Sequence, residues 1–178
     1  VSAVRTAMNV VVPGAMNVMK WIETEIARAI KSGAPEIRWT TPSGFIVKQK
    51  LMKTAKSTIE SQLMGRVKIS ISGAETGVDL KHHKNATAPN LIHSLDASLL
   101  HIAMIDVNFP IALIHDSVLC RATDMCKLST LVRKTYMTLF AENEPLTDFA
   151  LAIGAEEQPP IIGDLKPEAV IDSQYFFC

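Results

Sequence analysis

Three stretches of the chain repeat apolar residues at the 3.6-residue period typical of a helix that buries one face. Pro89 suits an early position in the second of these helices, and Thr123 or Asp124 can cap the third. The pattern therefore predicts core-facing helices over residues 15–30, 89–106 and 125–139.

Shorter runs have the character of strands. Residues 36–40 and 45–51 flank the segment Thr41-Pro42-Ser43-Gly44, which favours a turn, so they predict a hairpin. Residues 66–72 alternate apolar and polar side chains, which predicts a half-buried strand with a basic, hydroxyl-rich outer face. We interpret residues 73–77 as the turn after this strand and residues 81–84 as a loop.

Two further apolar runs, residues 111–114 and 118–120, meet around the polar tip His115-Asp116-Ser117. The simplest interpretation is two buried strands joined by a turn. Together with the helices, these strands predict an α+β fold.

Composition limits the class of protein. With 178 residues, 48% of them hydrophobic and a mean hydropathy of +0.19, the chain can bury one substantial core. No apolar stretch reaches the roughly 18 residues of a membrane span, and the first residues do not have the order of a secretory signal. We expect a soluble cytoplasmic protein with no membrane partner, in the host cell's cytoplasm if a phage encodes it. Because the chain starts at Val1, we expect it to be part of a longer polypeptide.

The three cysteines form no C-x-x-C pair, which argues against a disulfide framework or a zinc site. The formal net charge is zero, yet it is unevenly distributed. Residues 45–84 carry eight basic and three acidic side chains, whereas residues 141–178 carry one basic and eight acidic side chains. The basic stretch predicts contact with phosphate; the alternative is two solvated faces of opposite sign.

Asp116 is the strongest candidate for chemistry, because a carboxylate at the edge of an apolar strand pair needs a partner or a metal. Consecutive strand residues point to opposite faces, so His115, Asp116 and Ser117 cannot form a hydrolase triad. A hard-cation site fits better, since Mg²⁺ binds through one or two carboxylates and substrate phosphates. Asp96, three residues after His93 on a helix, is the candidate second carboxylate. The alternatives are a hydrogen-bonded turn and a hydrogen-bonded helical pair.

The segments NATAPNLIHSLDASLL (residues 85–100) and IALIHDS (residues 111–117) resemble, in order and spacing, the paired palm motifs of phage-type and mitochondrial single-subunit RNA polymerases. The segment RWTTPSGFIV (residues 38–47) and the aromatic carboxyl terminus also resemble this family. The resemblance spans essentially the whole chain and implies one carboxyl-terminal palm segment over residues 1–178. It implies a protruding promoter-recognition β-hairpin over residues 45–72 and a carboxyl-terminal foot over residues 160–178.

The resemblance also implies roles for single residues. Asp116 matches the second metal-binding aspartate, and His115 matches its neighbouring catalytic histidine. His93 and Ser117 match positions near the primer end and the incoming nucleotide, and Phe177 matches an aromatic residue of the foot. The expected DNA-binding residues of the hairpin are Lys53, Lys56, Glu60, Arg66, Lys68 and Ser70.

The implied activity is Mg²⁺-dependent transcription, with template and promoter DNA, ribonucleoside triphosphates and RNA product as partners. The family's first metal aspartate and its fingers helix have no counterpart here, so the resemblance implies an upstream polymerase segment or a second polypeptide. Val118 and Leu119 stand where the family commonly has an aromatic residue after the serine, which bears on local packing. Ser117 favours RNA polymerases over the related DNA polymerases, whose motif usually reads histidine-aspartate-glutamate. A non-catalytic nucleic-acid-binding remnant and a plain structural β-ribbon are the remaining alternatives.

Overall fold

The computed structural model describes residues 2–61, 67–161 and 163–176. Within these residues, helices combine with three two-stranded antiparallel sheets, so the predicted α+β class is confirmed. The elements are α1 (Ser2–Val11), α2 (Pro13–Lys31), β1 (Ile37–Thr40), β2 (Ile46–Gln49), β3 (Met52–Ser61), β4 (Val67–Val78), α3 (Leu80–Ile105), β5 (Ile111–Ile114), β6 (Ser117–Cys120), η1 (Ala122–Asp124), α4 (Met125–Glu142), α5 (Pro145–Ile153) and η2 (Pro167–Val170).

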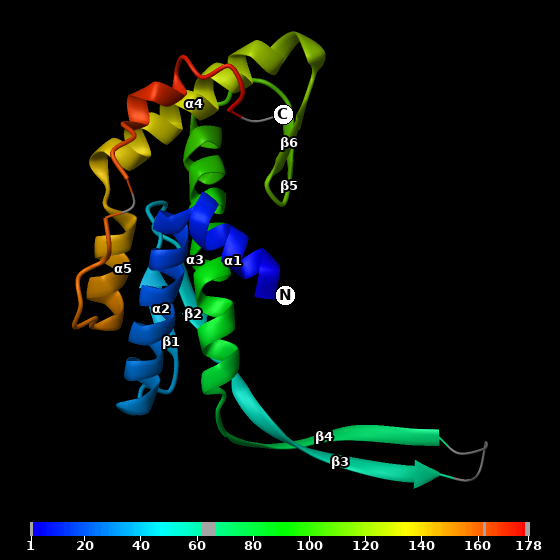
Figure 1. The fold of residues 1–178 in the computed structure, drawn as a ribbon. Coiled ribbons are helices and arrows are strands. Elements are labelled where there is room, and N and C mark those ends of the chain that lie inside the picture. The colour runs from blue at the N-terminus through cyan, green and yellow to red at the C-terminus, as the bar shows by residue number, and fades with distance from the viewer. Residues whose placement is uncertain (1, 62–66, 162, 177–178) are drawn as a thin grey trace.

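The 26-residue helix α3 is the axis of the molecule (Figure 1). Along its first half it packs against α2 and β2, and along its second half against α4. Two separate apolar clusters follow from this arrangement. The first joins α2, β1, α3 and α5, whereas the second joins the end of α3 to α4 and β6. A single helix therefore links the two cores.

Aromatic rings fill the first core. The ring of Phe149 meets the rings of Trp39 and Trp21 edge to face, at centroid distances of 5.6 and 6.3 Å. Both indole N–H groups find acceptors: Trp39 Nε1 donates to Ser94 Oγ at 3.0 Å, and Trp21 Nε1 donates to the carbonyl of Glu157 at 3.0 Å. The bond from Trp39 holds β1 against α3.

The predicted β1–β2 hairpin is confirmed, with Thr40 opposite Ile46. Gly44 has φ of 82°, a left-handed conformation that glycine adopts without steric cost. Ser43 Oγ lies 3.0 Å from Ser98 Oγ on α3 and 3.1 Å from Thr41 Oγ1. The turn is thereby bonded to the helix.

Strands β3 and β4 form a two-stranded ribbon that extends away from the helices (Figure 1). Its register runs from Met52 opposite Val78 to Ser61 opposite Val67. The predicted hairpin bounds, residues 45–72, are therefore wrong: Ile46–Gln49 pairs with β1 instead. The expected turn at residues 73–77 is also wrong, because β4 continues through it with shifts of register near Lys53 and Thr54, as in a β-bulge.

Buried polar groups fasten the ribbon to α3. His83 is completely buried; its Nδ1 lies 2.9 Å from the Asp79 carbonyl, and its Nε2 accepts a long bond from the Leu51 amide at 3.4 Å. Gln49 Nε2 donates to Thr87 Oγ1 at 2.8 Å, and Asn90 donates to Gln49 Oε1 at 2.7 Å. The root of the ribbon, where β3 begins and β4 ends, is thus tied to α3.

The helix over residues 89–106 begins earlier than predicted, at Leu80, and Pro89 lies inside it. The loop predicted at residues 81–84 is wrong because the Asp79 carboxylate accepts the His82 amide at 2.9 Å and caps the helix there. Hydrogen bonds from His83 and Thr87 compensate the burial of polar side chains in this turn.

The second core is built around α4, which begins at Met125 as predicted. Asp124 is 4% exposed and precedes this helix without a side-chain cap bond; its carboxylate pairs with Arg121 at 3.0 Å and Lys127 at 3.3 Å. Across the part of the chain that the structure covers, no helix has both the length and the apolar character needed to cross a membrane.

Candidate functional site

The candidate site begins at the turn between β5 and β6. Ile114 pairs with Ser117, so His115 and Asp116 form a two-residue turn. His115 has φ of 59°, a left-handed conformation that is uncommon for any residue with a side chain. Such strain, about 1–2 kcal/mol, is often found at functional sites.

The strands leading to this turn are less buried than predicted. Ile114 is 59% exposed and Leu119 is 57% exposed, whereas Val118 packs against the second core. The prediction of two buried strands is therefore wrong. Apolar side chains of both strands are therefore left exposed by the described part of the chain.

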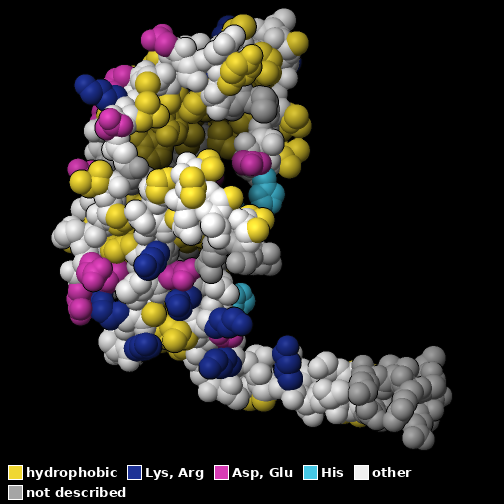
Figure 2. All heavy atoms as spheres, in the orientation of Figure 1, with side chains coloured by type: hydrophobic (Ala, Val, Ile, Leu, Met, Phe, Trp, Pro, Cys, Tyr) yellow, Lys and Arg dark blue, Asp and Glu magenta, His cyan; other side chains and the backbone are white. Residues whose placement is uncertain are grey.

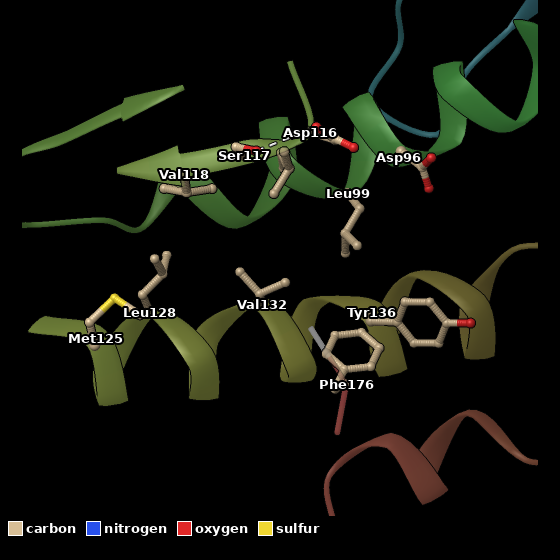
Figure 3. A pocket seen from close by; sticks show the side chains of 11 residues that line it. Asp96, Leu99, Asp116, Ser117, Val118, Met125, Leu128, Val132, Tyr136 and Phe176 are labelled. Carbon is tan, nitrogen blue, oxygen red and sulfur yellow. Dashed lines mark hydrogen bonds between the residues drawn. The ribbon is translucent and has the colours of Figure 1, made fainter. Parts of the chain in front are cut away.

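Asp116 lies on the rim of a cavity of about 460 Å³. Figure 3 shows the cavity between the β5–β6 hairpin, α3 and α4, with Asp116 and Asp96 at the same end. Its apolar wall includes Leu99, Val118, Met125, Leu128, Val132, Tyr136 and Phe176. The cavity thus has two carboxylates on its rim and an apolar floor.

The two carboxylates come from different elements, Asp116 from the turn and Asp96 from α3. Partial burial beside the apolar wall raises the pKa of Asp96, His93 opposes this rise through its charge, and the charge of Asp116 adds to it. The pKa of Asp96 therefore depends on the charges of both His93 and Asp116. A bound cation would favour its ionised form.

The other expected site residues lie around this rim. His93 is exposed and shares a face of α3 with Asp96. Ser117 lines the cavity, and its Oγ donates a long hydrogen bond of 3.5 Å to Asp116 Oδ1. His115 is exposed at the turn itself. The structure brings Asp96, Asp116 and Ser117 to one cavity.

The carboxyl-terminal segment closes the cavity on the α4 side. Phe176 lies in its wall, and its ring contacts Tyr136 at a centroid distance of 5.1 Å. Arg133 donates to the carbonyls of Val170 and Ser173, at 2.6 Å each, and its guanidinium lies 5.3 Å from the centre of the Phe176 ring. Phe177, the aromatic residue expected here, lies outside the described residues.

Sequence reasoning missed Arg133. It stands between apolar positions of α4 as an ordinary polar residue of an amphipathic helix, and its acceptors are backbone carbonyls some 40 residues away. Backbone acceptors leave no trace in the sequence.

The ribbon has two different faces, since alternate residues of a strand point to opposite sides. Thr58 is opposite Ser70, and Lys56 is opposite Ser72, on the polar face. Ile59 opposite Ile69, with Ile71 nearby, forms the other face, and these isoleucines are 48–50% exposed.

Of the expected DNA-binding residues, Lys56 and Ser70 share the polar face and are exposed. Lys53 is also exposed, but it lies beyond the register shift at the start of the ribbon. Glu60 and Lys68 are opposite one another in the ladder. Their side chains, and the whole of Arg66, lie outside the described part of the chain.

The chemistry of the rim residues can be compared with what a metal ion requires. Among them, no group of three His, Cys, Asp or Glu side chains is arranged to hold an ion. Mg²⁺ binds through one or two carboxylates and completes its shell with waters and phosphates. Asp116, with Asp96 nearby, fits this limited protein contribution.

Similar proteins are RNA polymerases of phages and plant organelles. The DNA-directed RNA polymerase of Pseudomonas phage phiKMV is 30% identical over 175 residues, covering 97% of this chain and 21% of that protein. The chloroplastic/mitochondrial DNA-directed RNA polymerase 2 of Arabidopsis thaliana is 30% identical, covering 90% of this chain and 16% of its own length. DNA-directed RNA polymerase 2A of Nicotiana tabacum is 29% identical, with 53% of its length covered.

The chain thus spans about a fifth of the length of the phage relative. The family model for DNA-dependent RNA polymerases matches residues 1–155, which contain α3, the ribbon and the turn that carries Asp116. With this match over most of its length, the chain belongs to the DNA-dependent RNA polymerase family.

Proposed function

We propose that the chain is the carboxyl-terminal, palm-type part of a single-subunit DNA-directed RNA polymerase that adds ribonucleotides to RNA on a DNA template. The observation that carries this proposal is the strained two-residue turn. It presents Asp116 on the rim of a cavity, at the same end as Asp96, within a chain of this polymerase family. A strained turn that exposes a carboxylate suits a site where substrate and ion meet.

Asp116 is the proposed magnesium ligand, and Asp96 is the nearby carboxylate that a cation would keep ionised. A magnesium ion held there would lower the pKa of an attacking hydroxyl and balance the charge of leaving pyrophosphate. The long bond from Ser117 to Asp116 Oδ1 restrains one oxygen and leaves the other open. The family's first metal aspartate has no counterpart in this chain, so an upstream polymerase segment or a second polypeptide is proposed to supply it.

His93 and His115 flank this rim on exposed surfaces, one on α3 and one in the turn. Their proposed role is to donate hydrogen bonds to the nucleotide and the RNA end. Phe176, held by the Arg133-anchored tail, closes the apolar side of the cavity and limits the access of water. The residues after 160 thus act as a foot beneath the active site.

The ribbon is the proposed promoter-recognition element. A two-stranded β-ribbon fits the major groove of B-DNA, and the polar face offers hydroxyl and amino groups that can contact base edges and phosphates. Lys56 and Ser70 on this face are the described side chains proposed to bind DNA. The isoleucines of the opposite face turn away from the groove.

The substitution Asp116→Asn tests the catalytic proposal in a polymerase reconstituted from this chain and an upstream polymerase segment. We expect nucleotide addition to fall about a thousandfold or more, since metal stabilisation is worth several kcal/mol and each 1.4 kcal/mol is tenfold. Promoter binding should persist. Asp148→Asn, an exposed aspartate on α5, is the matched control and should retain activity.

If Asp116→Asn elongates RNA as well as the control does, the metal role of Asp116 is wrong. If neither the parent chain nor the control adds nucleotides while both bind promoter DNA, the non-catalytic alternative is favoured instead.

A further inference from the structure

A second hollow, of about 530 Å³, lies where the ribbon joins the body of the protein. It is lined by Lys53 of the ribbon, by Leu80, Lys81 and Lys84 of the first turns of α3, and by Asn85. No carboxylate lines it among the described residues. Three lysines from two elements therefore line one concave surface.

Two carboxylates lie near lysines of this hollow. The Asp79 carboxylate accepts the His82 amide at 2.9 Å, and this bond is the main reason why its pKa is lowered, with Lys53 adding a smaller effect through its charge. Glu23 lies 4.0 Å from Lys84, at the limit of an ion pair on the surface. Neither Lys53 nor Lys81 forms an ion pair with another described residue.

The surroundings extend the positive surface. Figure 2 shows Lys and Arg side chains, with Asp and Glu side chains among them, over the lower ends of α2 and α3 and the start of the ribbon. A neighbouring hollow, which shares Lys84, includes Arg28 and Lys31 of α2 together with one carboxylate, Glu23. The first turn of α3 adds the positive end of its helix dipole, partly satisfied by Asp79. Positive groups spread over several positions suit an extended anion better than a single small one.

The position of the hollow favours duplex DNA. The ten residues of β3 reach about 30 Å at 3.3 Å per residue, whereas the major groove is about 12 Å wide. A ribbon of this length is longer than the groove is wide, so a ribbon with its outer part in the groove would have its root outside it, on the side of the phosphate backbone. The major groove of an RNA helix is too deep and narrow for such a ribbon.

We infer that Lys53, Lys81 and Lys84 bind the phosphodiester backbone of duplex DNA at the root of the ribbon, independently of base sequence. This inference rests on the proposed function of the ribbon. It gives the outer part and the root of the ribbon different roles in binding DNA. The outer part contacts bases, and the root holds the duplex by its phosphates. Phosphate contacts fix position and orientation without carrying sequence information.

The double substitution Lys81→Gln/Lys84→Gln tests this inference in the whole chain, by fluorescence anisotropy with a 20-base-pair duplex of arbitrary sequence at several salt concentrations. Each phosphate contact contributes about 0.9 to the slope of log K against log salt. We therefore expect the magnitude of the slope to fall by about 1.8 and binding near 0.1 M salt to weaken about tenfold or more. Lys53→Gln, on a different element, should reduce the slope by about 0.9.

Lys134→Gln/Lys166→Gln removes the same charge from α4 and the tail and is the matched control, with circular dichroism as the check on folding. If the control lowers the slope of log K against log salt by the same amount, the effect is one of net charge alone and the inference is wrong. So would a loss confined to single-stranded RNA of the same length. The assay involves no nucleotide addition, so its outcome is independent of whether Asp116→Asn abolishes catalysis.

Discussion

Asp96 on α3 and Asp116 in the β5–β6 turn face one cavity, and the charge of Asp116 reinforces the rise in the pKa of Asp96 that burial causes. Neither residue holds the other by a direct hydrogen bond among the interactions that the structure describes. The two carboxylates interact through their charges, so substituting one of them should change the pKa of the other.

Opposite substitutions should move the pKa of Asp96 in opposite directions. Asp116→Asn removes a negative neighbour and should lower this pKa, whereas His93→Gln removes a positive neighbour and should raise it further. Carboxyl-carbon NMR titration of Asp96 measures both shifts. His101→Gln, an exposed histidine one turn and more away on the same helix, is the control and should leave the titration unchanged. Shifts of the same sign in the first two variants would contradict the arrangement.

The strained backbone at His115 predicts how substitutions there change the free energy of unfolding and the activity. His115→Gly should leave the free energy of unfolding unchanged or raise it by up to about 1 kcal/mol, because glycine adopts a positive φ without steric cost. His115→Val should lower it by about 1–2 kcal/mol, since a β-branched residue fits this conformation poorly. Urea denaturation measures both values. Both variants should lose polymerase activity, and equal stabilities would show that the turn is unstrained.

Arg133 should control the order of the tail. Arg133→Gln removes two bonds of a charged donor to the carbonyls of Val170 and Ser173, each worth about 1.5–3 kcal/mol. We expect faster hydrogen exchange and faster proteolysis in residues 167–176, with α3 unaffected.

Lys134→Gln, the next residue on α4 but exposed, should leave the exchange of the tail at its parent rate. Unchanged protection in Arg133→Gln would mean that the ring contacts of Phe176 suffice to hold the tail. In that case the guanidinium would not be the anchor.

Elements with a regular apolar period could be predicted from the sequence, and α2, α4 and the β1–β2 hairpin agree with the pattern. The early turns of α3 could not, because residues 81–84 are polar and pattern reasoning assigns polar runs to loops. Here His83 is buried through hydrogen bonds to the backbone. Helix α5 has only nine residues, too few for a period to emerge.

The candidate site was predicted in part. The carboxylates Asp96 and Asp116 stand out because charge beside apolar residues is costly. Their common cavity depends on how the β5–β6 hairpin packs against α3 and α4, which no local pattern contains. The exposure of Ile114 and Leu119 could not be predicted either, because a strand rich in apolar residues is expected to be buried even where no other element covers it.

Helix α3 carries the anchor of the ribbon near one end and Asp96 along its length. A change in the length of the ribbon leaves the cavity where it is. One residue inserted between His83 and His93 would instead rotate everything beyond it by about 100° and advance it by about 1.5 Å. Helix α3 therefore sets both the separation and the angle between the root of the ribbon, where we propose that DNA binds, and the end of the cavity where Asp96 lies.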